Sequence, residues 1–413
     1  MCIRDRPATA PAAAPATPTP STGEAVDPGA PAAPLSLRAK HSVTQADFDQ
    51  TVRSVLGTTA ARRGYRGSLG GVQLGGYTTL EFVANSEKDS YFDLHRFVLQ
   101  VNAPISEWIG LAGEIEWEHG GTASYLDVGA VKIEYVDVLF QMCDAFNPKL
   151  GALLIPFGRF NLFHDDPLND FTMRPWTGRY MVPAGWGQPG VGAEGVFPVG
   201  CAGALSYNVA VTNGFTDGFT TDSGARGART TWKKDNNASK QVWGRLNAVL
   251  NVPRTDNFEL GLSGTWSRYD DDDDHDLFGF GGDFNVLVGP FELEGEYVQY
   301  DLDRDPTAPV EDPRRQSALW LEAAYHFFPG GWNCPRKPFV TWTSHFTLAF
   351  RYQRMDLNHR MRGGSFIDDL QSFGAALNYR ITEDTVFRVD WTYFDAVNED
   401  DRTEFTASFS TYF

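Results

Sequence analysis

Charged side chains of both signs concentrate in one stretch of the chain, residues 158–189. Carboxylate, imidazole and guanidinium groups this close together can form ion pairs. Around a narrow passage they can also create a transverse field that selects solutes by size and charge. Trp176 and Trp186 lie in the same stretch, and their rings could stack on a solute. The charged candidates are Arg159, His164, Asp165, Asp166, Asp170, Arg174 and Arg179.

Glutamates recur at every second position in two other stretches of the chain. This spacing places all members of a row on one face of a β-strand. An acidic row beside water could attract cations, or it could be an ordinary solvated face. The rows are Glu114, Glu116 and Glu118, and Glu292, Glu294 and Glu296; Arg351 and Arg388 are among the fewer bases expected on the same inward face.

Neither catalysis nor a cofactor is predicted. Histidines such as His95, His164, His326 and His359 have no serine or cysteine partner in a recognisable motif. The acidic run 270–276 could bind Ca²⁺, but it lacks the glycine and spaced glutamate of a defined calcium loop and is more typical of a solvated loop. We therefore expect no catalytic residue and no metal ligand.

The elements that position these residues are strands. From residue 72 to the end, apolar and polar residues alternate with period two, which indicates β-strands with one apolar face. Connections between the strands are alternately short and long, as in outer-membrane barrels. The expected strands are 72–84, 92–102, 108–119, 128–140, 149–157, 190–198, 203–212, 241–251, 258–268, 277–287, 291–301, 316–327, 343–355, 367–380, 385–395 and 403–413.

Composition supports this reading. The 413 residues carry a net charge of −18, which disfavours nucleic acid as a partner. No run of 18 apolar residues suggests a transmembrane helix, but a spanning strand needs only about 9–11 residues, of which every second one is apolar. A sandwich or propeller would alternate too, but here aromatic residues often lie near strand ends, which favours membrane girdles. The fold class expected is all-β, a transmembrane antiparallel β-barrel of about sixteen strands over residues 72–413.

The N-terminal part differs in composition from the rest. Residues 1–40, rich in alanine, proline and threonine, are expected to form a disordered linker. Residues 41–71 are expected to form a short periplasmic helix, over 44–56, and a basic hinge. No apolar segment follows the first six residues, so they do not resemble a secretory signal, and the natural start is expected to be missing.

Two sets of residues resemble known families. The last residues, with Phe409 and Phe413 at alternate apolar positions, resemble the C-terminal assembly signal of bacterial outer-membrane proteins, which the barrel insertion machinery reads. The stretches 149–160, 188–192 and 207–214 resemble the phosphate-selective porin family. This resemblance implies a sixteen-stranded homotrimeric porin in contact with outer-membrane lipid and lipopolysaccharide. The arginine ladder of that family is missing here, so phosphate selectivity is not expected.

The function expected is passive diffusion of small hydrophilic solutes and ions, with cations preferred. Residues 158–189 take the place of the third external loop, which folds inward in sixteen-stranded porins; the alternative is a loop that lies outside. A channel specific for anions such as phosphate or for sugars, and a structural anchor that reaches the cell wall through the N-terminal segment, are the alternative functions. Single-channel conductance separates these possibilities.

Two of the four cysteines, Cys143 and Cys201, fall in turns expected to be neighbours at the periplasmic rim. The periplasm is oxidising, so these two could form a disulfide, or both could be free.

Overall fold

The computed structural model describes the barrel and little of the chain that precedes it. The expected linker and helix lie outside the described residues. Among those that are described, no helix is long and apolar enough to cross a bilayer. The described ranges are 67–69, 71–86, 89–121, 129–329, 340–341, 343–361, 363–397 and 399–413.

All sixteen predicted strands are present, each within three residues of its expected bounds, and a short strand β1 (Gly67–Leu69) pairs with the first of them. The sixteen are β2 (Val72–Asn85), β3 (Tyr91–Pro104), β4 (Ile109–Glu118), β5 (Ala130–Phe140), β6 (Asn147–Leu154), β7 (Gly187–Pro198), β8 (Gly203–Thr212), β9 (Gln241–Leu250), β10 (Asn257–Arg268), β11 (Asp276–Val288), β12 (Phe291–Leu302), β13 (Arg315–Phe327), β14 (His345–Asp356), β15 (Leu370–Thr382), β16 (Thr385–Asp395) and β17 (Arg402–Tyr412).

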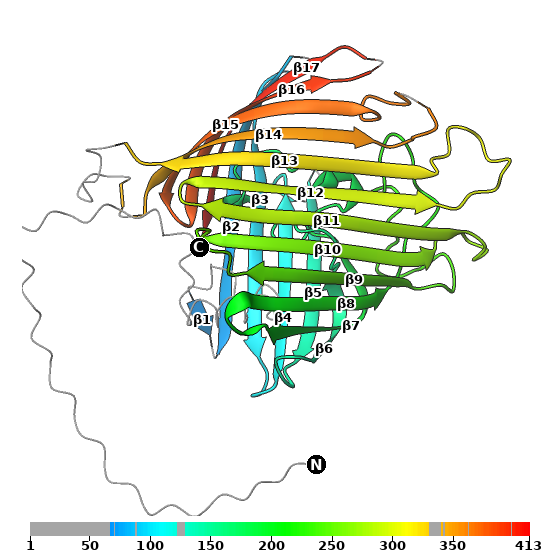
Figure 1. The fold of residues 1–413 in the computed structure, drawn as a ribbon, viewed down its shortest axis with the longest axis horizontal. Coiled ribbons are helices and arrows are strands. Elements are labelled where there is room, and N and C mark those ends of the chain that lie inside the picture. The colour runs from blue at the N-terminus through cyan, green and yellow to red at the C-terminus, as the bar shows by residue number, and fades with distance from the viewer. Residues whose placement is uncertain are drawn as a thin grey trace, which may run out of the picture. The chain divides into compact units, whose positions relative to one another are not determined.

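Each strand pairs antiparallel with its neighbours in the sequence, and the wall closes where β17 pairs with β2. The strands follow one another in chain order around the wall (Figure 1). The closing register runs from Glu404 opposite Asn85 to Tyr412 opposite Tyr77. Closure gives every strand from β2 to β17 two hydrogen-bonded partners, which satisfies the backbone polar groups without water.

The two faces of the wall differ as the alternation predicts. Outward side chains are large, apolar and exposed, whereas the alternate, inward positions are mostly polar and buried. An exposed apolar surface around the whole wall suits lipid and not water. Examples on the outer face are Phe97, Val191, Leu262, Phe280, Leu321, Phe350, Leu377 and Trp391.

The two ends of the barrel carry different connections. One end has mostly short turns, such as 289–290 and 383–384. The other end has long loops, among them 213–240, 303–314 and 357–369, which extend from the right-hand side of the wall in Figure 1. The connection 328–344 is a long exception at the short-turn end. Much of it, including Cys334, lies outside the described residues.

Part of the interior near the long-loop end is apolar, which the alternation did not predict. Aromatic residues of two loops pack there against inward residues of β9 and β12. Phe157 lies edge-on to Trp243, with ring centroids 5.8 Å apart, and stacks on Tyr300 at 5.8 Å. Phe215, from the loop 213–240, contacts the same two wall residues. These contacts fill one side of the lumen.

The inward loop as candidate channel constriction

The connection between β6 and β7 is the candidate site, and its observed bounds are 155–186. The predicted bounds, 158–189, were wrong by three residues. Strand β6 ends at Leu154, just before Pro156, which has no N–H for a strand ladder. The loop contains two short helices, Asp166–Leu168 and Thr177–Met181. Most of its side chains are buried, although the outer face of the barrel is exposed, because the loop lies against the inner wall.

The first polar contacts of the loop are with β10 and β12, and they begin with the N–H of Gly158, which donates to Ser263 Oγ at 3.1 Å. The carboxylate of Glu296 accepts hydrogen bonds from the backbone N–H groups of Arg159 and Phe160, the latter at 2.9 Å. Gly158 permits this approach: its φ is +70°, and a Cβ there would lie 2.7 Å from Glu296 Oε2. The guanidinium of Arg159 then pairs with Glu259 on β10 at 2.8 Å. Glu296, predicted as a lumen-lining charge, therefore holds the loop.

The second contact is with β5. His164 is fully buried, and its Nε2 lies 2.8 Å from the carboxylate of Glu134. Its Nδ1 lies 2.9 Å from the carbonyl oxygen of Asn161. Both ring nitrogens are thus engaged, one by the wall and one within the loop, which fixes the orientation of the imidazole.

The third contact joins the loop to β3 and β17. Arg96 donates two hydrogen bonds from Nη1 to the carboxylate of Asp166, at 2.8 and 2.9 Å, and pairs with Glu116 through Nε at 2.7 Å. Asp165 accepts hydrogen bonds from Gln100 at 3.2 Å and from the Tyr412 hydroxyl at 3.0 Å. Charged hydrogen bonds in a buried place are strong and directional, so they set the position of this part of the loop.

Two arginines on β15 and β16 bind the next residues of the loop. Arg380 donates to the carbonyl oxygen of Pro167 at 2.7 Å and to the carboxylate of Asp170 at 2.8 Å. Arg388 donates to the carbonyl oxygen of Asn169 at 2.8 Å. These guanidinium groups supply donors to loop carbonyl oxygens that have no strand partner.

The last contacts of the loop are with residues of β14 and again with β12. Arg351 pairs with Glu322 at 2.7 Å and donates to the carbonyl oxygen of Met173 at 2.7 Å. The backbone N–H of Trp176 donates to Gln353, and the hydroxyl of Tyr300 donates to the carbonyl oxygen of Met181. The loop is therefore attached to strands on several sides of the barrel and crosses the lumen.

Of the seven charged residues predicted for the constriction, five contact the wall through their side chains, as described above. Arg174 instead donates to Ala184 within the loop, and Arg179 is exposed and lies over the ring of Tyr180. Arg174 Nε and Nη2 are buried with no hydrogen-bond partner among the described residues.

The predicted lumen glutamates differ in their exposure. Glu114 and Glu116 are fully buried, the first hydrogen-bonded to Gln100 and the second paired with Arg96. Three others keep part of their side-chain surface exposed: Glu118 with 22%, Glu292 with 19% and Glu294 with 26%. Alternation assigned all of them to the inward face, but it did not predict which would be covered.

Two tryptophans in the loop do not face an open passage. Trp176 stacks on Phe394 and Trp186 packs edge-on against Trp243, and each is 2% exposed. These rings are part of the apolar cluster. This arrangement does not support the idea that they stack on a solute.

The wall residues that bind the loop were not recognised as its partners from the sequence. Strand alternation alone places Glu134, Arg96 and Arg380 on the inward face, but it does not indicate that they contact the loop. Tyr412 had been read only as part of the terminal strand. The opposite charges of the acidic loop residues and the few inward arginines are the signal that could have suggested the pairing.

The two cysteines are free and exposed in the structure, contrary to the disulfide considered for Cys143 and Cys201. The backbone of Cys143 pairs with that of Phe146 in an isolated antiparallel β-bridge in the turn after β5. Cys201 lies in the next turn along the rim, where its carbonyl oxygen accepts a hydrogen bond from Asn251. Each turn thus has its own local partners.

The acidic run after β10 is used for contacts between loops. Asp273 accepts hydrogen bonds from the backbone N–H groups of Ala238 and Ser239. Partial burial acts to raise the pKa of Asp270, but hydrogen bonds from the backbone of His275 and Asp274 outweigh it, and the pKa is lowered. Protein N–H groups thus stabilise these carboxylates.

The amino-acid sequence has little similarity to known protein families. No protein-family profile matches the chain. It is 30% identical to an uncharacterized protein of Aquifex aeolicus (strain VF5) over 146 residues, which are 35% of this chain and 32% of that protein. The match thus spans about a third of the relative's length. The resemblance to phosphate-selective porins is not confirmed and rests on the sequence motifs alone.

Solved structures of outer-membrane proteins share the fold. OmpF of Salmonella typhi, in complex with daunomycin, has a TM-score of 0.53 at 11% identity, covering 83% of this chain and 97% of that one. OprB of Pseudomonas putida has a TM-score of 0.53 at 11% identity, covering 83% and 94%. A loop-deletion mutant of OmpT, an outer membrane protein of Vibrio cholerae, has a TM-score of 0.50 at 12% identity, covering 83% and 99%.

These identities are low, so the likeness shows the fold. The shared fold, the closed wall and the apolar outer face all indicate a barrel that spans a membrane. The chain is a multi-pass, sixteen-stranded β-barrel of the bacterial outer membrane.

Proposed function

We propose that this chain is a porin, through which small hydrophilic solutes and ions diffuse passively, and that loop 155–186 narrows the passage. The observation that carries the proposal is the set of buried ion pairs and hydrogen bonds that fixes the loop across the lumen. A sixteen-stranded barrel encloses more space than its inward side chains can fill. A rigidly held loop would reduce that space to a defined cross-section.

The proposed passage also carries a net negative charge. Glu292 and Glu294 keep exposed surface on the inward face, and so does Glu118, which pairs with the partly exposed Lys132. Buried arginines there are bound to carboxylates or to loop carbonyl oxygens. Exposed acidic groups raise the local concentration of cations. We therefore infer a preference for cations over anions.

Planar-bilayer recording of the purified, refolded barrel tests the proposal. We expect discrete conductance steps that grow linearly with voltage and do not saturate with solute. Saturable block by one solute would support the specific channel instead. A folded barrel with no conductance would contradict the porin and leave the structural anchor; the N-terminal segment expected to reach the cell wall lies outside the described residues.

The partners of a porin follow from its outer surface. We propose that the apolar outer face contacts lipid and lipopolysaccharide, and that three copies form a homotrimer, as the sequence resemblance implies. Native mass spectrometry in detergent measures the number of chains, and a monomer that conducts would contradict the trimer alone.

The terminal phenylalanines provide a prediction about assembly. Phe413 stacks on Phe97 with ring centroids 5.5 Å apart, remains 39% exposed, and donates its N–H to the carbonyl oxygen of Gly76. Phe409 packs on Phe387. If the insertion machinery reads the terminal ring, Phe413→Ser should lower the amount of barrel in the outer membrane severalfold, while refolding in detergent changes little. Heat-modifiable gel migration measures both.

The control is Phe373→Ser, which removes an outward ring that is 49% exposed on β15, away from the terminal strand. Equal loss of membrane assembly in the two variants would show that only hydrophobic surface matters.

A further inference from the structure

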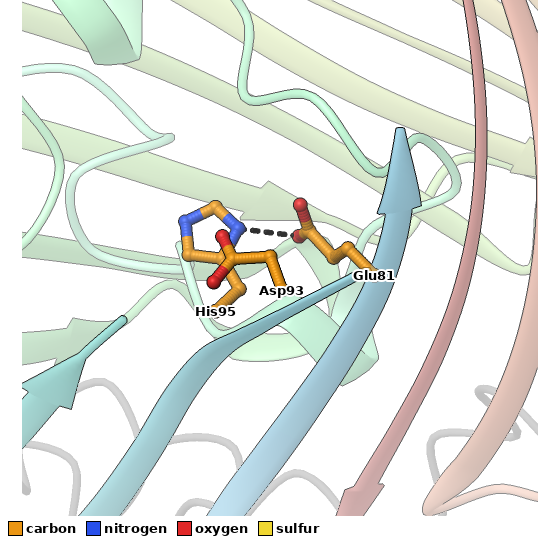
Figure 2. Close-up of side chains that lie close together, drawn as sticks. All are labelled: Glu81, Asp93 and His95. Atoms are coloured by element: carbon orange, nitrogen blue, oxygen red, sulfur yellow. Dashed lines mark ion pairs between the residues drawn. The ribbon is translucent and has the colours of Figure 1, made fainter. Parts of the chain in front are cut away.

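Two histidines and two carboxylates gather inside the barrel near the long-loop end, apart from the contacts that hold loop 155–186. Glu81 lies on β2, Asp93 and His95 lie on β3, and His119 directly follows β4. Figure 2 shows Glu81 and His95 directed toward one another, with Asp93 beside them. One ligand atom each of Glu81, Asp93 and His95 can be chosen so that all three lie within 4.8 Å of one another.

A β-bulge produces this arrangement. Thr79 pairs with Arg96, and Glu81 pairs with Asp93, so Leu94 and His95 on β3 oppose the single residue Leu80 on β2. A bulge of this kind turns two successive side chains toward the same face. His95 therefore faces inward beside Arg96, whereas strict alternation would direct it to the lipid.

The carboxylate of Glu81 has one close neighbour, the imidazole of His95. Its Oε1 lies 2.6 Å from Nδ1 of His95, but neither atom makes a hydrogen bond among the described residues, so they face each other outside hydrogen-bond geometry. Glu81 is only 6% exposed. A buried carboxylate oxygen without a donor is costly, and a cation would relieve that cost.

The charged neighbours of Glu81 and Asp93 and the access of water bear on whether a cation can bind there. Arg96 forms ion pairs with Asp166 and Glu116, and none with Glu81 or Asp93 is found among the described residues. His119 Nδ1 lies 2.8 Å from Asp93 Oδ2, and its ring stacks on that of His95 with centroids 5.3 Å apart. A hydrogen bond of this kind orients a carboxylate ligand. The side chains of His95 and Asp93 are 21% and 15% exposed, so an ion can reach them from water.

We propose that Glu81, Asp93 and His95 bind one divalent transition-metal ion of the Zn²⁺ class, and that His119 is a positioning residue for Asp93. Imidazole nitrogen with carboxylate oxygen suits Zn²⁺, whereas Ca²⁺ and Mg²⁺ prefer oxygen ligands throughout. In a tetrahedral site with metal–ligand distances of about 2.0–2.2 Å, two ligand atoms lie roughly 3.3–3.6 Å apart. Binding requires rotamer changes at the solvent-accessible Asp93 and His95 that lengthen the 2.6 Å contact between Glu81 Oε1 and His95 Nδ1 and shorten any separation near the 4.8 Å limit. Water completes the coordination from the open side.

A second group of similar composition does not carry the same inference. Glu134 and His164, with Glu114, are fully buried, and both nitrogens of His164 are engaged with Glu134 and Asn161. That histidine holds the loop and has no lone pair directed at an empty position.

Isothermal titration of the full chain in detergent with ZnCl₂ tests the proposal and needs no ion flow, so a failure of the porin function would not affect it. We expect one Zn²⁺ per chain, not displaced by a hundredfold excess of MgCl₂. His95→Gln and Asp93→Asn should each weaken binding about tenfold or more. The control His359→Ala removes an exposed histidine that lies near Asp356 in a loop, and should bind as the wild type does.

Cobalt distinguishes ligands from the positioning residue. His95→Gln should abolish the visible absorption of bound Co²⁺, whereas His119→Gln should shift it and keep the stoichiometry of one. Circular dichroism confirms that each variant is folded, and Asp93→Asn provides a second ligand test if His95→Gln does not fold. A wild type that binds no Zn²⁺, or ligand variants that bind as well as His359→Ala does, would overturn the site.

Discussion

Replacing residues 165–174 with ten glycine and serine residues is expected to raise the single-channel conductance by about twofold or more and to admit larger sugars, because the narrowest cross-section limits flow. The replacement removes Asp166 and Asp170, the partners of Arg96 and Arg380, and leaves the loop length unchanged. Equal length matters because this segment crosses the lumen between the contact of His164 with Glu134 on β5 and that of Trp176 with Gln353 on β14. Liposome-swelling rates with sugars of increasing size measure the cut-off.

The control for this replacement is the same treatment of residues 305–312, which lie in the long loop between β12 and β13 and whose backbone accepts hydrogen bonds from Arg314, Asn358 and Arg360. Its conductance should equal that of the wild type. If the two replacements behave alike in correctly folded barrels, loop 155–186 does not limit the passage.

Glu292→Gln combined with Glu294→Gln is expected to lower the permeability of K⁺ relative to Cl⁻ by roughly twofold. Both side chains keep exposed surface near the short-turn end of β12, where Asn285 donates to each of them. His326 contacts Glu292, and Arg159 lies 3.6 Å from Glu294, so these groups reduce the field without removing it. Reversal potentials in a KCl gradient measure the ratio.

Glu296 is left unchanged in this experiment because it accepts hydrogen bonds from the loop backbone and its loss would also move the loop. The matched control removes two charges from the long loop between β12 and β13, with Glu311→Gln and Asp312→Asn, and should leave the ratio unchanged. An anion-selective wild type would refute the cation preference.

The sequence by itself determined the wall of the barrel. In a membrane barrel, one face of each strand contacts lipid and the other faces the lumen, so every spanning segment repeats the same alternation. Residues such as Phe387, Val389 and Trp391 therefore predict their strand without knowledge of its partner strands. The same rule placed Glu114, Glu292 and Arg388 on the inward face. The position of loop 155–186 could be expected from its length and place in the strand order.

Only the tertiary structure decided which inward charges are covered. Asp166 meets Arg96, and Asp170 meets Arg380, across 70 and 210 residues of sequence. Such pairs depend on barrel closure and on the path of the loop, which no local pattern encodes. For this reason Glu296 and Arg351, predicted as lumen charges, proved to hold the loop.

The orientation of His95 was likewise decided by the structure. Alternation assigns His95 to the face opposite Arg96, but the bulge at Leu80 turns both residues inward and brings His95 to Glu81. A single extra residue in one strand reverses the face to which all later side chains of that strand point. The position of this bulge depends on how the two strands pair. The sequence of β3 alone therefore could not bring these groups together.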